Sequence, residues 1–215
     1  MRSQFATRAE AGRLLGARLF ETYGGADAVV LGLPRGGVPV AAEVARSLGA
    51  PVDVFVVRKL GVPWQPELAF GAVAGGGVRV LNPGVVAAAR LDDATIERLT
   101  AVGAAEVERR EQAYRGARAP VALSGRMVIV VDDGIATGAT MRAAVQAIRA
   151  HRPAGVVVAA PVAPAQVVEQ LTKSADRLLV LVSAARFDSV GWFYGDFAQL
   201  SDEDVQRILR GRDTS

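Results

Sequence analysis

The chain has 215 residues, 51% hydrophobic and 22% charged, which is ordinary for a globular domain with a sizeable core. It has no cysteine and one histidine, which excludes disulfides, thiolate metal sites, a cysteine nucleophile and a histidine-cluster metal site. The formal charge is +3 and the arginines are scattered, so we expect no nucleic-acid partner. No apolar stretch could span a bilayer and no signal peptide is evident, so we expect no membrane association and a cytoplasmic location.

The first part of the chain has the pattern of a parallel sheet. Apolar residues at helical spacing predict an opening helix over Phe5–Tyr23. A buried strand over Ala28–Leu33, a helix over Val38–Leu48 and a strand over Val52–Val57 are predicted to follow. This strand–loop–helix–strand order is the repeating unit of an α/β fold.

Residues 60–83 interrupt this pattern with many glycines and prolines. Within them, Ala69–Ala74 and Val78–Leu81 flank a run of glycines and predict a β-hairpin. An aspartate at position 92 or 93 is placed to cap a long helix that runs to about Arg118. The hairpin therefore stands outside the repeating pattern.

Strands and helices alternate again in the second half of the chain. The predicted elements are a strand over Met127–Val131, a helix over Ala139–Ala150, a strand over Gly155–Pro161, a helix over Pro164–Lys173, a strand over Leu178–Ser183 and a helix from Ser201 to Arg210. Residues 184–200, called the hood below, are irregular and rich in aromatic residues. We therefore predict one α/β domain over residues 1–215, with a Rossmann-like parallel sheet flanked by helices, a flexible hairpin at 60–83 and a small hood.

The stretch from Val128 to Thr140, VIVVDDGIATGAT, is the most informative part of the sequence. Four apolar residues predict a buried strand, and Asp132 and Asp133 follow at its carboxyl end, where open α/β sheets bind ligands. A loop of small residues with two threonines then opens into a helix, whose start favours a phosphate. Carboxylates that accept hydrogen bonds from sugar hydroxyls, beside a phosphate-binding loop, suit a sugar phosphate. The alternative is an ordinary turn with solvated aspartates.

This stretch resembles the signature of the type I phosphoribosyltransferases, which use 5-phosphoribosyl 1-pyrophosphate (PRPP). One position departs, because Gly134 stands where an aliphatic residue is usual. The resemblance implies that Asp132 and Asp133 hold the ribose 2- and 3-hydroxyls and that Ala136–Thr140 hold the 5-phosphate. The PRPP-binding residues expected here are Asp132, Asp133, Gly134, Ala136, Thr137, Gly138, Ala139 and Thr140.

A second anion-binding loop is expected after the first strand. Gly36 and Gly37 let the backbone approach a ligand closely, and Arg35 offers a planar fork that suits phosphate oxygens. By resemblance, this loop binds the pyrophosphate of PRPP. Arg58 and Lys59 end the second predicted strand at the same sheet edge and would add positive charge beside the leaving group. A plain turn and a solvated basic pair are the alternatives.

By resemblance, the hood binds the acceptor of the reaction. Its flat rings suit stacking on a base or another aromatic acceptor, and its carboxylates suit a proton or a hydrogen bond. The expected pocket residues are Phe187, Trp192, Phe193 and Tyr194, with Asp188 or Asp196 as the carboxylate. The alternative is a hydrophobic cluster that tethers the carboxyl end of the chain to the sheet.

The resemblance implies transfer of the phosphoribosyl group of PRPP to a small, aromatic nitrogenous acceptor, with release of pyrophosphate. The catalytic residues expected are Arg35, Lys59, Asp132 and Asp133. Mg²⁺ would be held mainly by PRPP oxygens, with Asp132 or Asp133 helping directly or through water. The hairpin would close over PRPP, unless it is a static surface feature. Ala136 replaces the aspartate of the 6-oxopurine salvage enzymes, which argues against a hypoxanthine-guanine type.

Two other functions remain open at this point. One is a regulator that senses PRPP or a nucleotide without turnover, and the other is a hydrolase that uses water as the acceptor. The sequence has no P-loop, no dinucleotide-binding glycine fingerprint and no hydrolase nucleophile elbow. Family members often form dimers, so a homodimer is a further expectation.

Overall fold

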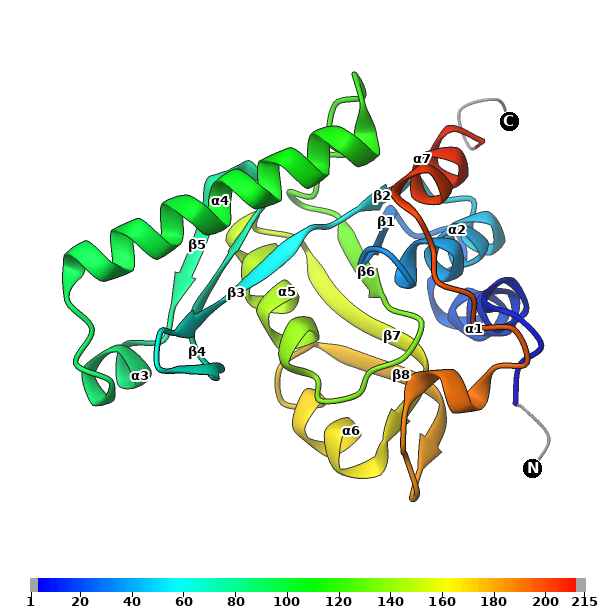
Figure 1. Ribbon diagram of the computed structural model, residues 1–215. Coiled ribbons are helices and arrows are strands. Elements are labelled where there is room, and N and C mark those ends of the chain that lie inside the picture. Colours follow the sequence, from blue (N-terminus) through cyan, green and yellow to red (C-terminus); the bar gives the residue numbers. More distant parts are fainter. Residues whose placement is uncertain (1–3, 212–215) are drawn as a thin grey trace.

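The structure is a computed structural model that describes residues 4–211. Its centre is a parallel five-stranded sheet with the order β2-β1-β6-β7-β8 (Figure 1). The five strands are β1 (Ala28–Gly32), β2 (Val52–Val54), β6 (Met127–Val131), β7 (Gly155–Pro164) and β8 (Arg177–Ala184). The predicted parallel α/β architecture is therefore confirmed.

Helices cover both faces of this sheet because alternate strand residues point to opposite sides. Ile129 and Val131 pack with α1 (Arg8–Tyr23) and α2 (Gly37–Leu48) on one face. On the other face, α5 (Ala139–Ala150) and α6 (Ala165–Leu171) pack against the strand residues of opposite parity. The three central strands β1, β6 and β7 are apolar and match the continuous runs in the sequence, as expected of strands buried on both faces.

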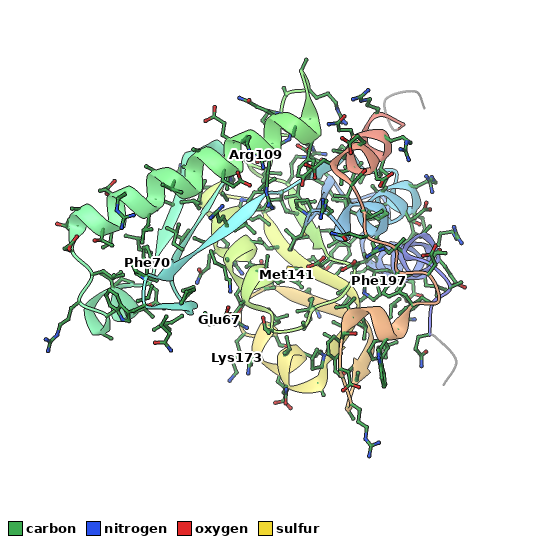
Figure 2. All side chains as sticks on the ribbon, viewed as in Figure 1. Glu67, Phe70, Arg109, Met141, Lys173 and Phe197 are labelled. Atoms are coloured by element: carbon green, nitrogen blue, oxygen red, sulfur yellow. The ribbon has the colours of Figure 1, made fainter. Side chains whose placement is uncertain are left out.

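A second, antiparallel sheet lies beside α5 and belongs to the segment that breaks the sequence pattern. It consists of β3 (Val57–Val62), β4 (Gln65–Ala74) and β5 (Val78–Leu81), with the short 3₁₀ turn η1 (Gly75–Gly77) between the last two. The long helix α4 (Asp93–Arg115) runs along this sheet, and α3 (Pro83–Ala88) closes its lower end (Figure 1). Phe70 of β4 is fully buried in the core of this antiparallel sheet, whereas Met141 of α5 is buried in the core of the parallel sheet (Figure 2).

Two sequence predictions about this segment need correction. The single strand predicted over Val52–Val57 is wrong, because the chain leaves the parallel sheet after Val54 and enters the antiparallel sheet at Val57. Phe55 and Val56 between them are also buried, so the apolar run continues through the break. The hairpin is confirmed, but it forms part of a three-stranded sheet with its own core, and the sequence analysis missed α3.

The amino-terminal end of the described chain meets the hood. Phe5 donates its N–H to Phe193 O at 2.9 Å and forms a parallel bridge with Tyr194. The hood contains a short 3₁₀ helix, η2 (Val190–Phe193), and leads to α7 (Asp202–Arg210). Ser201 caps α7 through a capping box with Asp204, as its position in the sequence predicts. Within residues 4–211, no helix is long and apolar enough to cross a membrane.

Candidate active site

The two predicted acids lie at the carboxyl end of β6 and touch each other. Asp132 Oδ1 accepts the N–H of Asp133 at 2.9 Å, and the side chain of Asp133 is largely buried. Burial raises the pKa of Asp132, and the neighbouring Asp133 carboxylate raises it further. Burial also raises the pKa of Asp133, although Arg8 acts in the opposite direction. Two acids held together out of water form a site that favours a cation or a hydrogen-bond donor.

Arg8 is a site residue that the sequence did not reveal. Its Nε donates to Asp133 Oδ2 at 2.8 Å, although the two residues are 125 positions apart in the chain. Both side chains are only 12% exposed, so this ion pair is shielded from solvent. Nothing in the local pattern around Arg8 indicates this partner.

The loop between the acids and α5 leads directly into that helix, as the sequence predicts. Gly138 caps α5 with a φ of 71°, a left-handed conformation that favours glycine. Ala136, Thr137 and Thr140 are exposed, and Thr137 Oγ1 accepts the N–H of Ala139 at 3.4 Å. The loop therefore turns free backbone donors and two hydroxyls outward at the start of a helix.

The loop after β1 lies directly against the acid pair. It contains a cis peptide between Pro34 and Arg35. A Cβ atom on Gly36 would lie 2.5 Å from Asp133 Cγ, and one on Gly37 would lie 2.6 Å from Val131 O. Only glycines allow this contact, which brings the two predicted anion-binding loops together at one sheet edge.

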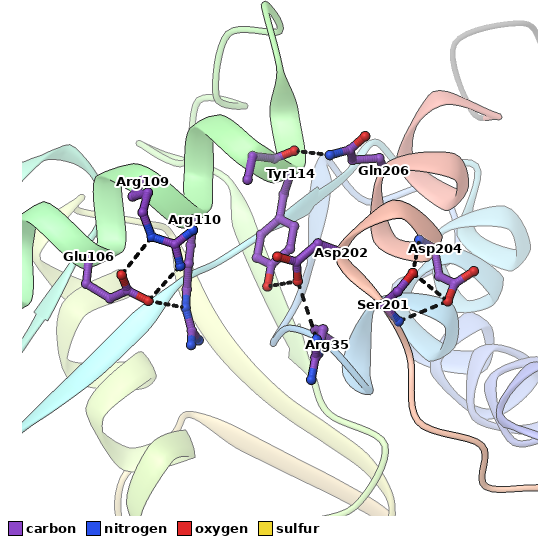
Figure 3. A network of polar contacts seen from close by, with 10 residues as sticks. Arg35, Glu106, Arg109, Arg110, Tyr114, Ser201, Asp202, Asp204 and Gln206 are labelled. Atoms are coloured by element: carbon purple, nitrogen blue, oxygen red, sulfur yellow. Dashed lines mark hydrogen bonds and ion pairs between the residues drawn. The ribbon is translucent and has the colours of Figure 1, made fainter.

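Arg35 is paired with α7 rather than free. Its Nη1 lies 3.6 Å from Asp202 Oδ1, and both side chains are 39% exposed. The hydroxyl of Tyr114 on α4 donates to the same Asp202 oxygen at 3.1 Å, so three elements meet at this carboxylate (Figure 3). Burial raises the pKa of Tyr114, and the Asp202 charge adds to this effect. No pattern in the sequence indicates Asp202 as a partner of Arg35.

The prediction that Arg58 and Lys59 lie together at the edge of the parallel sheet is wrong. Both belong to β3 of the antiparallel sheet, where neighbouring side chains point to opposite faces. Arg58 lies against α4, where it lines a small pocket with Glu106 and Arg110. Lys59 faces the other way, into a cleft of about 650 Å³ between the hairpin and α5 that Arg142 also lines. Of the two, Lys59 is therefore the one that faces α5. The first turn of α5 continues residues 136–140, which are called the phosphate loop below after the ligand predicted for them.

The hood forms a second cleft, of about 380 Å³, beside the phosphate loop. Phe187 and Asp188 line it together with Ala136 and Thr137. The ring of Phe193 stacks on Phe187 with centroids 5.5 Å apart. The ring of Phe187, the carboxylate of Asp188 and the loop residues Ala136 and Thr137 thus line the same cleft.

The other two predicted pocket aromatics are placed differently. Trp192 is 67% exposed and does not line this cleft. Tyr194 is 6% exposed, its ring packs between Phe5 and Phe197, and its hydroxyl donates to Asp133 O at 2.5 Å. The expectation that Tyr194 stacks on an acceptor is therefore wrong, because its ring is buried inside the hood between Phe5 and Phe197. Burial is also the main reason that its pKa is raised.

A sequence model of the phosphoribosyl transferase domain matches residues 5–192. The chain belongs to the phosphoribosyl transferase family. Helix α7, which supplies Asp202, lies beyond the residues that the family model covers. The comparison therefore assigns no role to the contact between Asp202 and Arg35.

Relatives of this chain support the same family. Two Mycobacterium tuberculosis proteins, provisionally named phosphoribosyl transferase MT0597 and Rv0571c, are each 50% identical to it over 205 residues. The match covers 95% of this chain and 46% of each relative, so the chain spans about half the length of the curated relatives it matches. The crystal structure of TT1426 from Thermus thermophilus has a TM-score of 0.88 at 44% identity, covering 96% of this chain and 97% of that chain.

The two acids of this site suit Mg²⁺ only in partnership with a ligand. Among residues 4–211, no cluster of three or more carboxylate or imidazole groups could hold a metal ion. One oxygen of Asp133 already accepts from Arg8, which leaves Asp132 as the more available carboxylate. Mg²⁺ commonly binds through one or two carboxylates, waters and substrate phosphates, and the donor set here fits that arrangement.

Proposed function

We propose that the chain transfers the 5-phosphoribosyl group of PRPP to a small, aromatic nitrogenous acceptor and releases pyrophosphate. The observation that carries this proposal is the contact between the acid pair and the two glycine-containing loops at one sheet edge. A sugar with a phosphate at one end and a pyrophosphate at the other needs three such elements side by side. Family membership supports the reaction class, and the acceptor is our own inference.

The phosphate loop is proposed to hold the 5-phosphate. Its exposed backbone and the hydroxyls of Thr137 and Thr140 lie at the start of α5, where the helix dipole favours an anion. Asp132, a few residues upstream, would accept hydrogen bonds from the ribose hydroxyls. These contacts would fix the sugar so that its C1 atom points toward the loop after β1.

The loop after β1 is proposed to hold the pyrophosphate. In the reaction, the bond from C1 to the pyrophosphate oxygen breaks, a nitrogen of the acceptor bonds to C1 from the opposite face, and the nitrogen loses a proton. Arg35, which belongs to this loop, and Lys59, which lines the cleft beside α5, are the cations proposed to stabilise charge that builds on the leaving oxygens. Mg²⁺, when bound, would neutralise part of that charge. Asp132 and Asp133 supply the carboxylates proposed to help hold the ion, directly or through water.

The cleft of the hood is proposed to receive the acceptor. Phe187 offers a ring for stacking, and Asp188 lines the same cleft and is placed to take the proton that the acceptor loses. Asp196 is the weaker candidate, because its Oδ1 already accepts the N–H of Ala198 at 3.1 Å. A planar, nitrogen-containing acceptor fits these groups best. A homodimer stays a prediction.

The proposal is tested by incubating the protein with PRPP and Mg²⁺, with and without a panel of nitrogenous bases and aromatic acids, and measuring pyrophosphate. Release that requires one acceptor supports the transferase. Release without an acceptor indicates a hydrolase, and tight PRPP binding without release indicates a sensing protein. Asp132→Asn should abolish release, whereas Glu97→Gln should leave it unchanged, because Glu97 of α4 pairs with Arg79 of β5 in the antiparallel sheet and not with any residue of the proposed site.

A further inference from the structure

The hood touches residues 132–134, called the acid loop below, at two places, and Arg8 of α1 contacts the same loop. Val190 of η2 packs over Gly134, where a Cβ atom would come within 2.5 Å of Val190 Cγ1. The hydroxyl of Tyr194 donates to Asp133 O, and Arg8 reaches the carboxylate of the same Asp133. The hood therefore holds the main chain of Asp133, whereas Arg8 of α1 holds its side chain.

Arg8 joins Asp133 to the far end of the hood. Beyond its bond to Asp133, Arg8 donates from Nη1 to Ala198 O at 2.9 Å, and its guanidinium lies 3.8 Å above the ring of Phe197. Phe197 in turn stacks on Tyr194 with centroids 5.1 Å apart. Each polar and aromatic contact of this guanidinium thus links the acid loop to the hood. A cation held on an aromatic ring and paired with a carboxylate, largely away from water, has little freedom to move.

Asp132 is in a different situation. Its Oδ1 accepts the N–H of Asp133, and no group within the described residues donates a hydrogen bond to its Oδ2. No cation of the described chain pairs with Asp132 at salt-bridge distance, whereas Asp133 lies 2.8 Å from Arg8. The two neighbouring acids therefore differ in how much of each carboxylate is left for a ligand.

We propose that Arg8 is a positioning residue that commits Asp133 to holding the hood, so that Asp132 supplies the carboxylate that grips the ribose hydroxyls. This inference rests on the proposed function for the sugar, and it departs from the equal roles that the family resemblance implies. It also explains why residue 134 is a glycine, because Val190 of the hood occupies the space that a larger side chain would need.

The test combines ribose 5-phosphate calorimetry with hydrogen–deuterium exchange of the hood in four single variants. Asp132→Asn should lose at least about tenfold in ribose 5-phosphate affinity, the loss expected when hydrogen bonds to a charged group are removed, and leave exchange in the hood unchanged. Asp133→Asn and Arg8→Met should speed exchange at residues 193–198 and keep affinity within about threefold. Arg8→Lys should restore part of the protection relative to Arg8→Met, because it keeps the positive charge beside Asp133 but loses the planar fork that also reaches Ala198 O.

Exchange in α4 serves as the internal control, because general destabilisation would speed exchange there as well. The inference is overturned if Asp133→Asn loses as much affinity as Asp132→Asn while the hood keeps its protection. It is equally overturned if Arg8→Met leaves the hood protected. If Asp133→Asn does not fold, the comparison of Arg8→Met with Arg8→Lys in hydrogen–deuterium exchange tests the inference by itself. A wild-type protein that binds no ribose 5-phosphate would instead contradict the proposed function, and the exchange of the hood would still report on Arg8.

Discussion

Gly134 lies directly beneath Val190, so closely that a Cβ atom would meet Val190 Cγ1 at 2.5 Å and Val162 Cγ1 at 3.0 Å. This contact accounts for the one departure of the chain from the family signature, where an aliphatic residue is usual. The hood occupies the space that such a side chain would fill. The acid loop and the hood are therefore fitted to each other, and the glycine belongs to that fit.

Restoring the usual aliphatic residue should damage the protein. We expect Gly134→Leu to lower stability by about 1–3 kcal/mol, the range for overpacking a filled site, as measured by thermal unfolding. Val190→Ala in the same protein should recover a large part of the loss, because it removes the two methyl groups nearest Gly134. A double variant that is no more stable than Gly134→Leu alone would show that Val190 is not the obstacle.

Gly36 offers a test of the contact between the two loops. Its φ of −62° suits any residue, so Gly36→Ala introduces only a steric conflict, with Cβ 2.5 Å from Asp133 Cγ. We expect pyrophosphate affinity to fall at least about tenfold, equivalent to about 1.4 kcal/mol, when calorimetry compares the variant with the wild type. Gly84→Ala is the matched control, since a Cβ atom on Gly84 of α3 would lie 3.5 Å from its nearest neighbour, Asn82 Oδ1, which is an ordinary van der Waals contact. Unchanged affinity in Gly36→Ala would mean that the loops separate without loss of the site.

The acid pair should reduce stability at neutral pH. The pKa of Asp132 is raised above its ordinary value of 3.8, so ionisation disfavours the folded state, and stability is lost as pH rises above that value. Asp132→Asn should therefore raise the melting temperature at pH 7, and the gain should shrink as pH falls toward 4. Asp176→Asn should instead lower the melting temperature at pH 7. Hydrogen bonds from the N–H of Val156 and from Arg149 lower the pKa of Asp176, so its charged form stabilises the folded state. A lower melting temperature for Asp132→Asn at pH 7 would contradict this account.

Asp202 should compete with pyrophosphate for Arg35. The exposed ion pair contributes about 0–1 kcal/mol, and asparagine still accepts from Tyr114, so Asp202→Asn should change stability little. Removal of the negative charge should raise pyrophosphate affinity by about threefold, equivalent to about 0.7 kcal/mol. Asp204→Asn on the same helix should weaken the capping box and lower stability while leaving pyrophosphate affinity unchanged. Weaker pyrophosphate binding in Asp202→Asn would mean that Asp202 orients Arg35 rather than competing for it.

The elements nearest the proposed site could be predicted because their signals are local. The strand Met127–Val131 and the helix Ala139–Ala150 have the predicted bounds. A continuous buried run, two acids and a glycine before a helix are all visible within one short stretch. The chemistry of Asp132 and the phosphate loop follows from the same stretch, and remains a prediction until a ligand is bound.

The rest depends on contacts between distant parts of the chain. The partner of Asp133 is Arg8, 125 residues away, and no local sequence pattern predicts this ion pair. The end of β2 could not be found because Phe55 and Val56 stay buried between two different sheets. Tyr194 looks like a ligand-stacking ring in the sequence, but its partner Phe5 comes from the other end of the described chain.

The most direct test of the account is a crystal of the protein soaked with ribose 5-phosphate. The account predicts density for a phosphate against the backbone of residues 136–140 and ribose hydroxyls within hydrogen-bond distance of Asp132. Density elsewhere, or a loop left empty at ligand concentrations that saturate binding in solution, would contradict it.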